Sequence, residues 1–124
     1  MNRILLIDDE QAYRQTIGNA LRQSGYCVFE AGDGERGIEI AQNERVDLII
    51  SDVVMEKLDG FAMIDRLRMD PATCTIPFIL MTGLADHESR RRGMTLGADD
   101  FLVKPFNPDL LFATLLKWLD KRPE

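Results

Sequence analysis

Short runs of apolar residues recur five times along the chain, and each is followed by polar residues. The first run is Ile4-Leu5-Leu6-Ile7, a continuous apolar stretch of the kind that forms a strand buried on both faces. The other runs have similar length and are rich in β-branched and aromatic residues. We therefore predict five strands, at 4–7, 26–31, 47–52, 78–81 and 101–103.

Helical spacing of apolar residues follows each predicted strand. We predict helices over 11–24, from a cap at Asp33, from a cap at Asp59 to before Pro71, over 86–96, and from Asn107-Pro108 to 121. Asp and Asn cap helix starts by accepting backbone N–H bonds, and Pro is favoured at the first helical position. The helix over 86–96 is predicted to be the weakest, because it is polar and interrupted by Gly93.

Alternating strands and helices of these lengths predict the α/β class, with repeated right-handed βαβ units and a doubly wound parallel sheet covered on both faces. The 124 residues suffice for one substantial core, so we expect a single domain over 1–124. Residues 121–124 are expected to be either its end or the start of a linker.

Composition and charge argue against several classes of protein. A net charge of −6 argues against nucleic-acid binding, which needs clustered Lys and Arg. The basic cluster Arg90-Arg91-Arg92 is short, and is predicted to be a solvated helix face first and a partner contact second. Two cysteines are too few for a disulfide scaffold. The chain shows no signal peptide and no apolar run near the ~20 residues of a membrane span. We expect a cytoplasmic protein that does not contact the membrane.

The candidate chemistry lies directly after the apolar runs, where parallel α/β sheets bind ligands. Asp8-Asp9 follow the first run, and Asp52, Thr82 and Lys104 end or follow the third, fourth and fifth. Clustered carboxylates repel one another unless a cation joins them, and Mg²⁺ prefers such oxygen ligands. Lys104 adds an ammonium and Thr82 a hydrogen-bond donor. The pattern predicts a phosphoryl-handling site, although the sequence has neither GxxxxGK[ST] nor GxGxxG.

These residues and their spacing resemble a response-regulator receiver domain, the phosphoacceptor switch of two-component signalling, over nearly the whole chain. Phe101 and the pair Lys104-Pro105 also match. Each motif is weak alone, but their joint occurrence in one βα chain is specific. The resemblance implies a flavodoxin-like (βα)5 fold with strand order 2-1-3-4-5.

The resemblance also implies roles for the site residues. Asp52 would accept a phosphoryl group from a phosphohistidine on a histidine kinase or phosphotransfer protein. Asp9 and Asp52 would bind Mg²⁺ directly with the backbone carbonyl of Val54, and Asp8 would act mainly through water. Lys104 would pair with Asp52 and the phosphoryl oxygens.

Further expectations concern the switch, its surroundings and the activity of the domain. Thr82 would bond a phosphoryl oxygen after transfer. Phe101 stands at the position of the switch aromatic, although an ordinary core role fits it nearly as well. The Lys104-Pro105 peptide bond would be cis. The domain would catalyse only its own phosphorylation and slow dephosphorylation.

The sequence departs from the family pattern at two places. Glu56 follows Met55 where a proline is usual, which predicts a more mobile loop with an added carboxylate near the metal. Phe101 replaces the more common tyrosine and has no hydroxyl. Because Asp52, Thr82 and Lys104 are kept, we expect an active receiver.

The expected partners are an output domain or effector protein and a second copy of the chain, bound through the fourth helix, fifth strand and fifth helix. Three other functions fit less well. A haloacid-dehalogenase-like phosphatase would carry Asp-x-Asp after the first strand, where this chain has Asp8-Asp9-Glu10. A flavodoxin would need a Ser/Thr/Gly-rich loop there. A pure interaction module would not need Asp52, Thr82 and Lys104 together.

Overall fold

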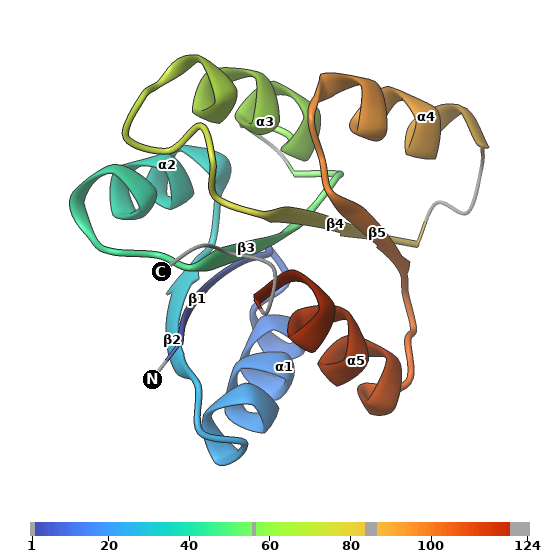
Figure 1. Cartoon of the computed structure of the whole chain (residues 1–124). Coiled ribbons are helices and arrows are strands. Elements are labelled where there is room, and N and C mark those ends of the chain that lie inside the picture. Colours follow the sequence, from blue (N-terminus) through green and yellow to red (C-terminus); the bar gives the residue numbers. More distant parts are fainter. Residues whose placement is uncertain (1, 56, 84–86, 120–124) are drawn as a thin grey trace.

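A parallel five-stranded sheet forms the centre of the computed structural model, which describes residues 2–55, 57–83 and 87–119 (Figure 1). The strand order is β2-β1-β3-β4-β5 and every neighbouring pair is parallel, which confirms the predicted topology. The strands are β1 Arg3–Ile7, β2 Cys27–Ala31, β3 Leu48–Asp52, β4 Phe78–Thr82 and β5 Asp100–Val103.

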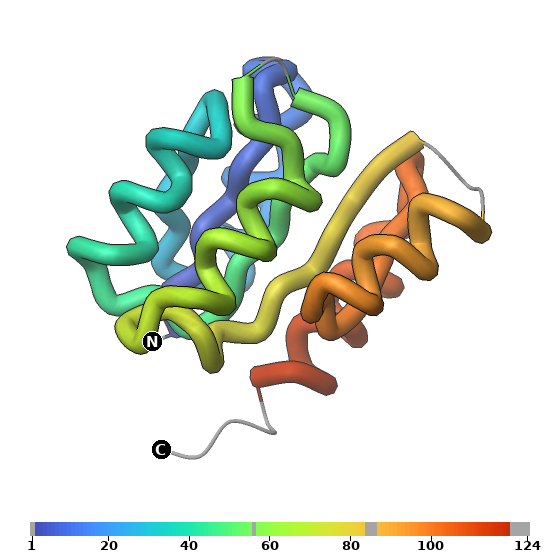
Figure 2. The backbone as a smooth tube through the Cα atoms, turned by 90° about the horizontal axis from the view of Figure 1, so that it is seen from above, coloured from blue at the N-terminus to red at the C-terminus, as the bar shows by residue number. Residues whose placement is uncertain are grey.

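Helices cover both faces of this sheet. They are α1 Gln11–Gln23, α2 Gly34–Asn43, α3 Gly60–Met69, α4 His87–Leu96 and α5 Pro108–Leu119. One face carries α1 and α5, and the other carries α2, α3 and α4, which lie side by side in Figure 2. Among the described helices, none combines the length and the apolar character that crossing a bilayer requires.

The continuous apolar runs are explained by burial on two sides. Along β1, Leu5 and Ile7 pack into the cluster under α2 and α3, whereas Ile4 and Leu6 pack into the cluster under α1 and α5. Alternate side chains of a strand point to opposite faces, so a strand between two helix layers must be apolar at every position. All four of these side chains are fully buried.

The predicted caps form. Asp33 Oδ1 accepts from the Arg36 amide at 2.8 Å and Asp59 Oδ1 from the Ala62 amide at 2.8 Å, at the starts of α2 and α3. Asn107 Oδ1 accepts from the Asp109 amide at 2.6 Å before α5. The predicted helix limits at 86 and 121 lie outside the described residues.

The prediction that Gly93 interrupts the fourth helix was wrong, since α4 is continuous from His87 to Leu96. Gly93 is the residue of α4 that is buried, and a Cβ atom there would collide with the Leu80 side chain. Its missing side chain therefore lets the helix approach β4 closely. Beside it, the Arg92 guanidinium lies over the Phe61 ring, 4.5 Å from the centroid, which attaches α4 to α3.

Candidate functional site

The chemically distinctive residues meet at the carboxyl edge of the sheet. The ladder pairs Ile7 with Ser51, Asp52 with Met81 and Thr82 with Val103. Neighbouring strands therefore end at nearly the same level, and the residues that end or follow them are brought together. The structure thus collects Asp8, Asp9, Asp52, Thr82 and Lys104 at one end of the fold.

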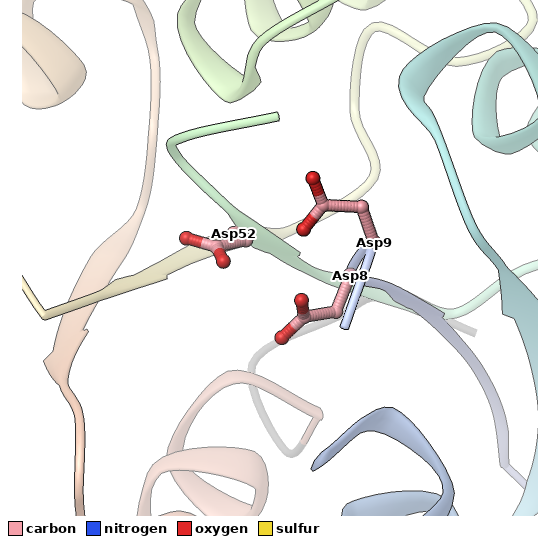
Figure 3. A group of neighbouring side chains, drawn as sticks. All are labelled: Asp8, Asp9 and Asp52. Atoms are coloured by element: carbon pink, nitrogen blue, oxygen red, sulfur yellow. The ribbon is translucent and has the colours of Figure 1, made fainter. Parts of the chain in front are cut away.

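Three carboxylates form the centre of the site. One oxygen from each of Asp8, Asp9 and Asp52 lies within 4.8 Å of the other two (Figure 3). Asp8 is fully buried and Asp52 is 8% exposed, while Asp9 is exposed. The cluster is therefore closed on the protein side and open to solvent at Asp9.

Lys104 connects two of these carboxylates. Its Nζ donates to Asp8 Oδ2 at 2.8 Å and to Asp52 Oδ2 at 2.9 Å. The backbone amide of Lys104 donates to the Thr82 carbonyl at 2.7 Å, which aligns the residue with the end of β4. The Lys104-Pro105 bond is cis, as predicted. The direct bond to Asp8 was not predicted.

The backbone around Asp52 is held by the start of α3. The Gly60 amide donates to the Val53 carbonyl at 2.9 Å. A Cβ atom on Gly60 would lie 2.6 Å from the Asp52 carbonyl oxygen, so only glycine allows the helix to begin this close to the strand end. Asp52 Oδ1 also accepts a long bond, 3.4 Å, from the Val54 amide. The Asp52 side chain is therefore presented from a fixed backbone.

Burial and charge act against each other in this site. Burial raises the pKa of Asp52 above its ordinary value, and the hydrogen bond from Lys104 lowers it again in part. Burial by itself would lower the pKa of Lys104, but its bonds to Asp8 and Asp52 outweigh this and the pKa is raised. The ammonium form of Lys104 is thereby favoured. Among the described residues, Lys104 is the cation that pairs directly with carboxylates of this cluster.

The remaining predicted site residues lie around this centre. Thr82 is buried at the end of β4 with 1% of its surface exposed. Phe101 is 9% exposed and packs into the core under α2 and α3, which suits a core role and an inward switch position alike. Val54 is 59% exposed beside Asp52. Glu56 lies outside the described residues. The functional roles of these residues remain predictions.

Lys104 has a further neighbour that was not predicted from the sequence. The Tyr13 ring, in the first turn of α1, lies with its centroid 4.5 Å from Lys104 Nζ. Tyr13 falls within the helix predicted over 11–24, but its partner could not be identified from the sequence, because Lys104 is far away along the chain. An aromatic residue shortly after the acidic pair is the signal that could have suggested this contact.

Known proteins with this sequence pattern and fold are numerous. Residues 4–116 match the family described as the response regulator receiver domain. The gliding motility regulatory protein of Myxococcus xanthus is 46% identical over 82% of this chain and 13% of its own length. The DNA-binding dual master transcriptional regulator RpaA of Synechocystis is 38% identical over 100% of this chain and 53% of its own length.

Two solved structures agree with this assignment. The chemotaxis protein CheY4 of Vibrio cholerae superimposes with a TM-score of 0.91 at 36% identity, over 95% of this chain and 98% of that one. The receiver domain of the sensor histidine kinase PA1611 from Pseudomonas aeruginosa, which has a magnesium ion coordinated in its active-site cleft, gives 0.90 at 29% identity, over 97% and 98%.

The chain spans 13% to 53% of the length of the curated relatives it matches, so the similarity concerns their receiver portion. Within that portion, the family match covers nearly all of the described fold, including the strand ends that carry the carboxylates and Lys104. The chain belongs to the response regulator receiver domains, the signalling switch domains of two-component systems.

Proposed function

We propose that this domain accepts a phosphoryl group on the carboxylate of Asp52. The observation that carries the proposal is the convergence of Asp52 with two other carboxylates and the Lys104 ammonium. In the transfer, an Asp52 oxygen forms a bond to phosphorus. The bond from phosphorus to a histidine nitrogen of a kinase or phosphotransfer protein breaks, and that nitrogen keeps the electron pair. The product is an acyl phosphate.

The donor set of the site fits Mg²⁺. Three carboxylates against one ammonium leave an excess of negative charge, and hard oxygen donors are what Mg²⁺ takes from proteins. Asp9 and Asp52 would bind the ion directly with the Val54 carbonyl, and Asp8 would act mainly through water. When bound, Mg²⁺ supplies positive charge that offsets the charge of the phosphoryl oxygens.

Lys104 and Thr82 would stabilise the modified state. The ammonium, which bonds Asp52 Oδ2 at 2.9 Å, is close enough to pair with a phosphoryl oxygen after transfer. Thr82 ends the strand next to β3 and would donate its hydroxyl to another phosphoryl oxygen. A phosphoryl group brings a charge of about −1.5 to −2, so both contacts would be charge-assisted.

The domain would also catalyse its own modification and its slow reversal. Because the acidic cluster is open to solvent at Asp9, a small phosphodonor and later a water molecule can approach Asp52. Attack of that water on phosphorus would release phosphate and restore the Asp52 carboxylate.

The signal would leave through the surface made by α4, β5 and α5. A phosphoryl group would pull Thr82 inward, hold Phe101 in its buried position and shift α4. That surface exposes Met94, Val103 and Leu110 to solvent, and Arg90 is exposed on α4. We propose that an effector, an output domain or a second copy binds there. The chain would act as one receiver domain in the cytoplasm.

Acetyl phosphate tests the proposed function without a kinase. With Mg²⁺, intact-mass measurement should show one added phosphoryl group on the wild type and none on Asp52→Asn, and chelating the metal should stop the reaction. Asp65→Asn, at an exposed position of α3, is the matched control and should react like the wild type. Equal labelling of Asp52→Asn would refute the proposal.

A further inference from the structure

Within the part of the chain that the structure describes, the Lys104 ammonium contacts two carboxylates and one aromatic ring. The carboxylates are those of Asp8 and Asp52, and the ring is that of Tyr13, with its centroid 4.5 Å from Nζ. The Lys104 side chain is only 18% exposed, so much of the water that would solvate its charge is displaced. An aromatic face attracts a cation electrostatically and replaces part of that lost hydration.

The ring is also held by the same loop that carries Lys104. Tyr13 and Phe106 meet edge to face, with centroids 6.3 Å apart and planes at 82°. Phe106 lies two residues after Lys104, and both aromatic residues pack against the core under α1 and α5. The position of the Tyr13 ring itself is therefore set by packing and does not depend on the carboxylates.

This independence matters when Asp52 changes. Once an Asp52 oxygen bonds to phosphorus, the carboxylate loses charge and Lys104 loses one of its anchors. The lysine stem is long and has many rotamers, so a loosely held ammonium would spread over several positions. The Tyr13 ring and Asp8 are the present contacts that are kept while the ammonium moves from the Asp52 oxygen to a phosphoryl oxygen.

We infer that Tyr13 is a positioning residue, whose ring holds the Lys104 ammonium beside Asp52 during phosphoryl transfer. The inference rests on the proposed function of Asp52. A cation–π contact at a partly desolvated site corresponds to about 2- to 30-fold in an equilibrium or rate constant. A residue that served only to fill the core would act through its volume, whereas this role requires the aromatic face.

The geometry can be measured without phosphorylation. Side-chain NMR should show the ε-methylene protons of Lys104 displaced upfield by the ring current of Tyr13. Lys57, which is exposed, provides the reference. The displacement should persist in Tyr13→Phe and vanish in Tyr13→Leu. A Lys104 signal at the reference position in the wild type would overturn the inference, and this result is available even if Tyr13→Leu does not fold.

Kinetics test the role itself. With acetyl phosphate and Mg²⁺, Tyr13→Leu should slow phosphorylation by about 2- to 30-fold, and Tyr13→Phe should recover most of the rate. Tyr26→Leu is the matched control, because Tyr26 packs against the same core but precedes β2 at the opposite edge of the sheet. It should lower stability without slowing the reaction. In a Lys104→Ala background, Tyr13→Leu should cause no further loss.

Two outcomes would overturn the positioning role. One is a rate for Tyr13→Phe as low as that of Tyr13→Leu, which would implicate the hydroxyl. The other is an undiminished effect of Tyr13→Leu in the Lys104→Ala background, which would mean that the ring acts through volume alone. If the wild type takes up no phosphoryl group, the proposed function fails, and the NMR comparison still decides where the ammonium lies.

Discussion

Lys104 Nζ lies 2.9 Å from Asp52 Oδ2, although the two residues are 52 positions apart in the chain. The contact exists because β3 and β5 end at the same edge of a parallel sheet, on either side of β4. The contact holds the buried Asp52 carboxylate in place. It does not fully neutralise the negative charge of the site, because Asp8 shares the same ammonium. The stability of the folded protein should therefore depend on the charge of Asp52.

The first prediction concerns Asp52→Asn in metal-free buffer. Burial raises the pKa of Asp52, so the protonated form favours folding, and that contribution is lost as pH rises through the raised pKa. At neutral pH the neutral side chain should therefore stabilise the protein, on the order of 1 kcal/mol or a few degrees in the unfolding midpoint.

The pH dependence of this stability gain tests whether the raised pKa of Asp52 is its cause. The advantage of Asp52→Asn should close as pH falls below about 4, where an ordinary carboxyl group is protonated in the unfolded chain too. Thermal unfolding over a pH series in chelator measures it. Asp65→Asn, which removes the same charge from an exposed position on α3, should show no such trend. A neutral-pH loss of stability in Asp52→Asn would contradict the electrostatic account.

The second prediction concerns metal and phosphoryl analogue. Beryllofluoride mimics a phosphoryl group on a carboxylate, so Mg²⁺ and beryllofluoride together should raise the unfolding midpoint by binding the folded state alone. Asp52→Ala should lose the combined shift, because it removes both a metal ligand and the attachment point. An undiminished shift in Asp52→Ala would place the ligand elsewhere.

The third prediction concerns the start of α3. A Cβ atom on Gly60 would lie 2.6 Å from the Asp52 carbonyl oxygen, so backbone must move to accept Gly60→Ala. We expect a loss of about 1–3 kcal/mol in the free energy of unfolding, typical of overpacking, and slower phosphorylation because Asp52 is displaced. Gly83→Ala, where a Cβ atom would meet nothing within 4 Å, is the stability control. Denaturant unfolding of the two variants should differ clearly.

The fourth prediction concerns the signalling surface. Only Gly93 of α4 is buried, so this helix has few apolar anchors and its amides should exchange readily. Beryllofluoride with Mg²⁺ should change hydrogen exchange in Gly83 and in α4 as well as in the metal-binding loops. If the change stops at the acidic loops and leaves 87–96 unaffected, the proposed output surface is wrong.

Much of the fold was predictable because its local signals agree. Runs such as Leu48-Ile49-Ile50 predicted buried strands, and Asp33, Asp59 and Asn107 predicted helix starts. The predicted ends of the strands were less exact. Asp100 pairs with Ile79 and so belongs to β5, but its polar side chain did not indicate a strand residue.

The site was predictable as a gathering of residues but not as a set of contacts. Because parallel α/β sheets bind ligands at the carboxyl ends of their strands, Asp8, Asp52 and Lys104 were expected at one edge of the sheet. That rule does not predict the direction in which each side chain points. Which carboxylates share the ammonium depends on burial and on packing across the sheet. The Tyr13 contact and the close approach of Gly93 to Leu80 arise in the same way, from residues that only the folded chain brings together.

The most direct test of the central claim is to locate the phosphoryl group on the chain. After reaction with acetyl phosphate and Mg²⁺, borohydride reduces an aspartyl phosphate to homoserine, which peptide mass spectrometry can place. The account predicts homoserine at position 52 and at no other position. Homoserine at Asp8 or Asp9, or a phosphoryl group on Thr82 or His87, would contradict it.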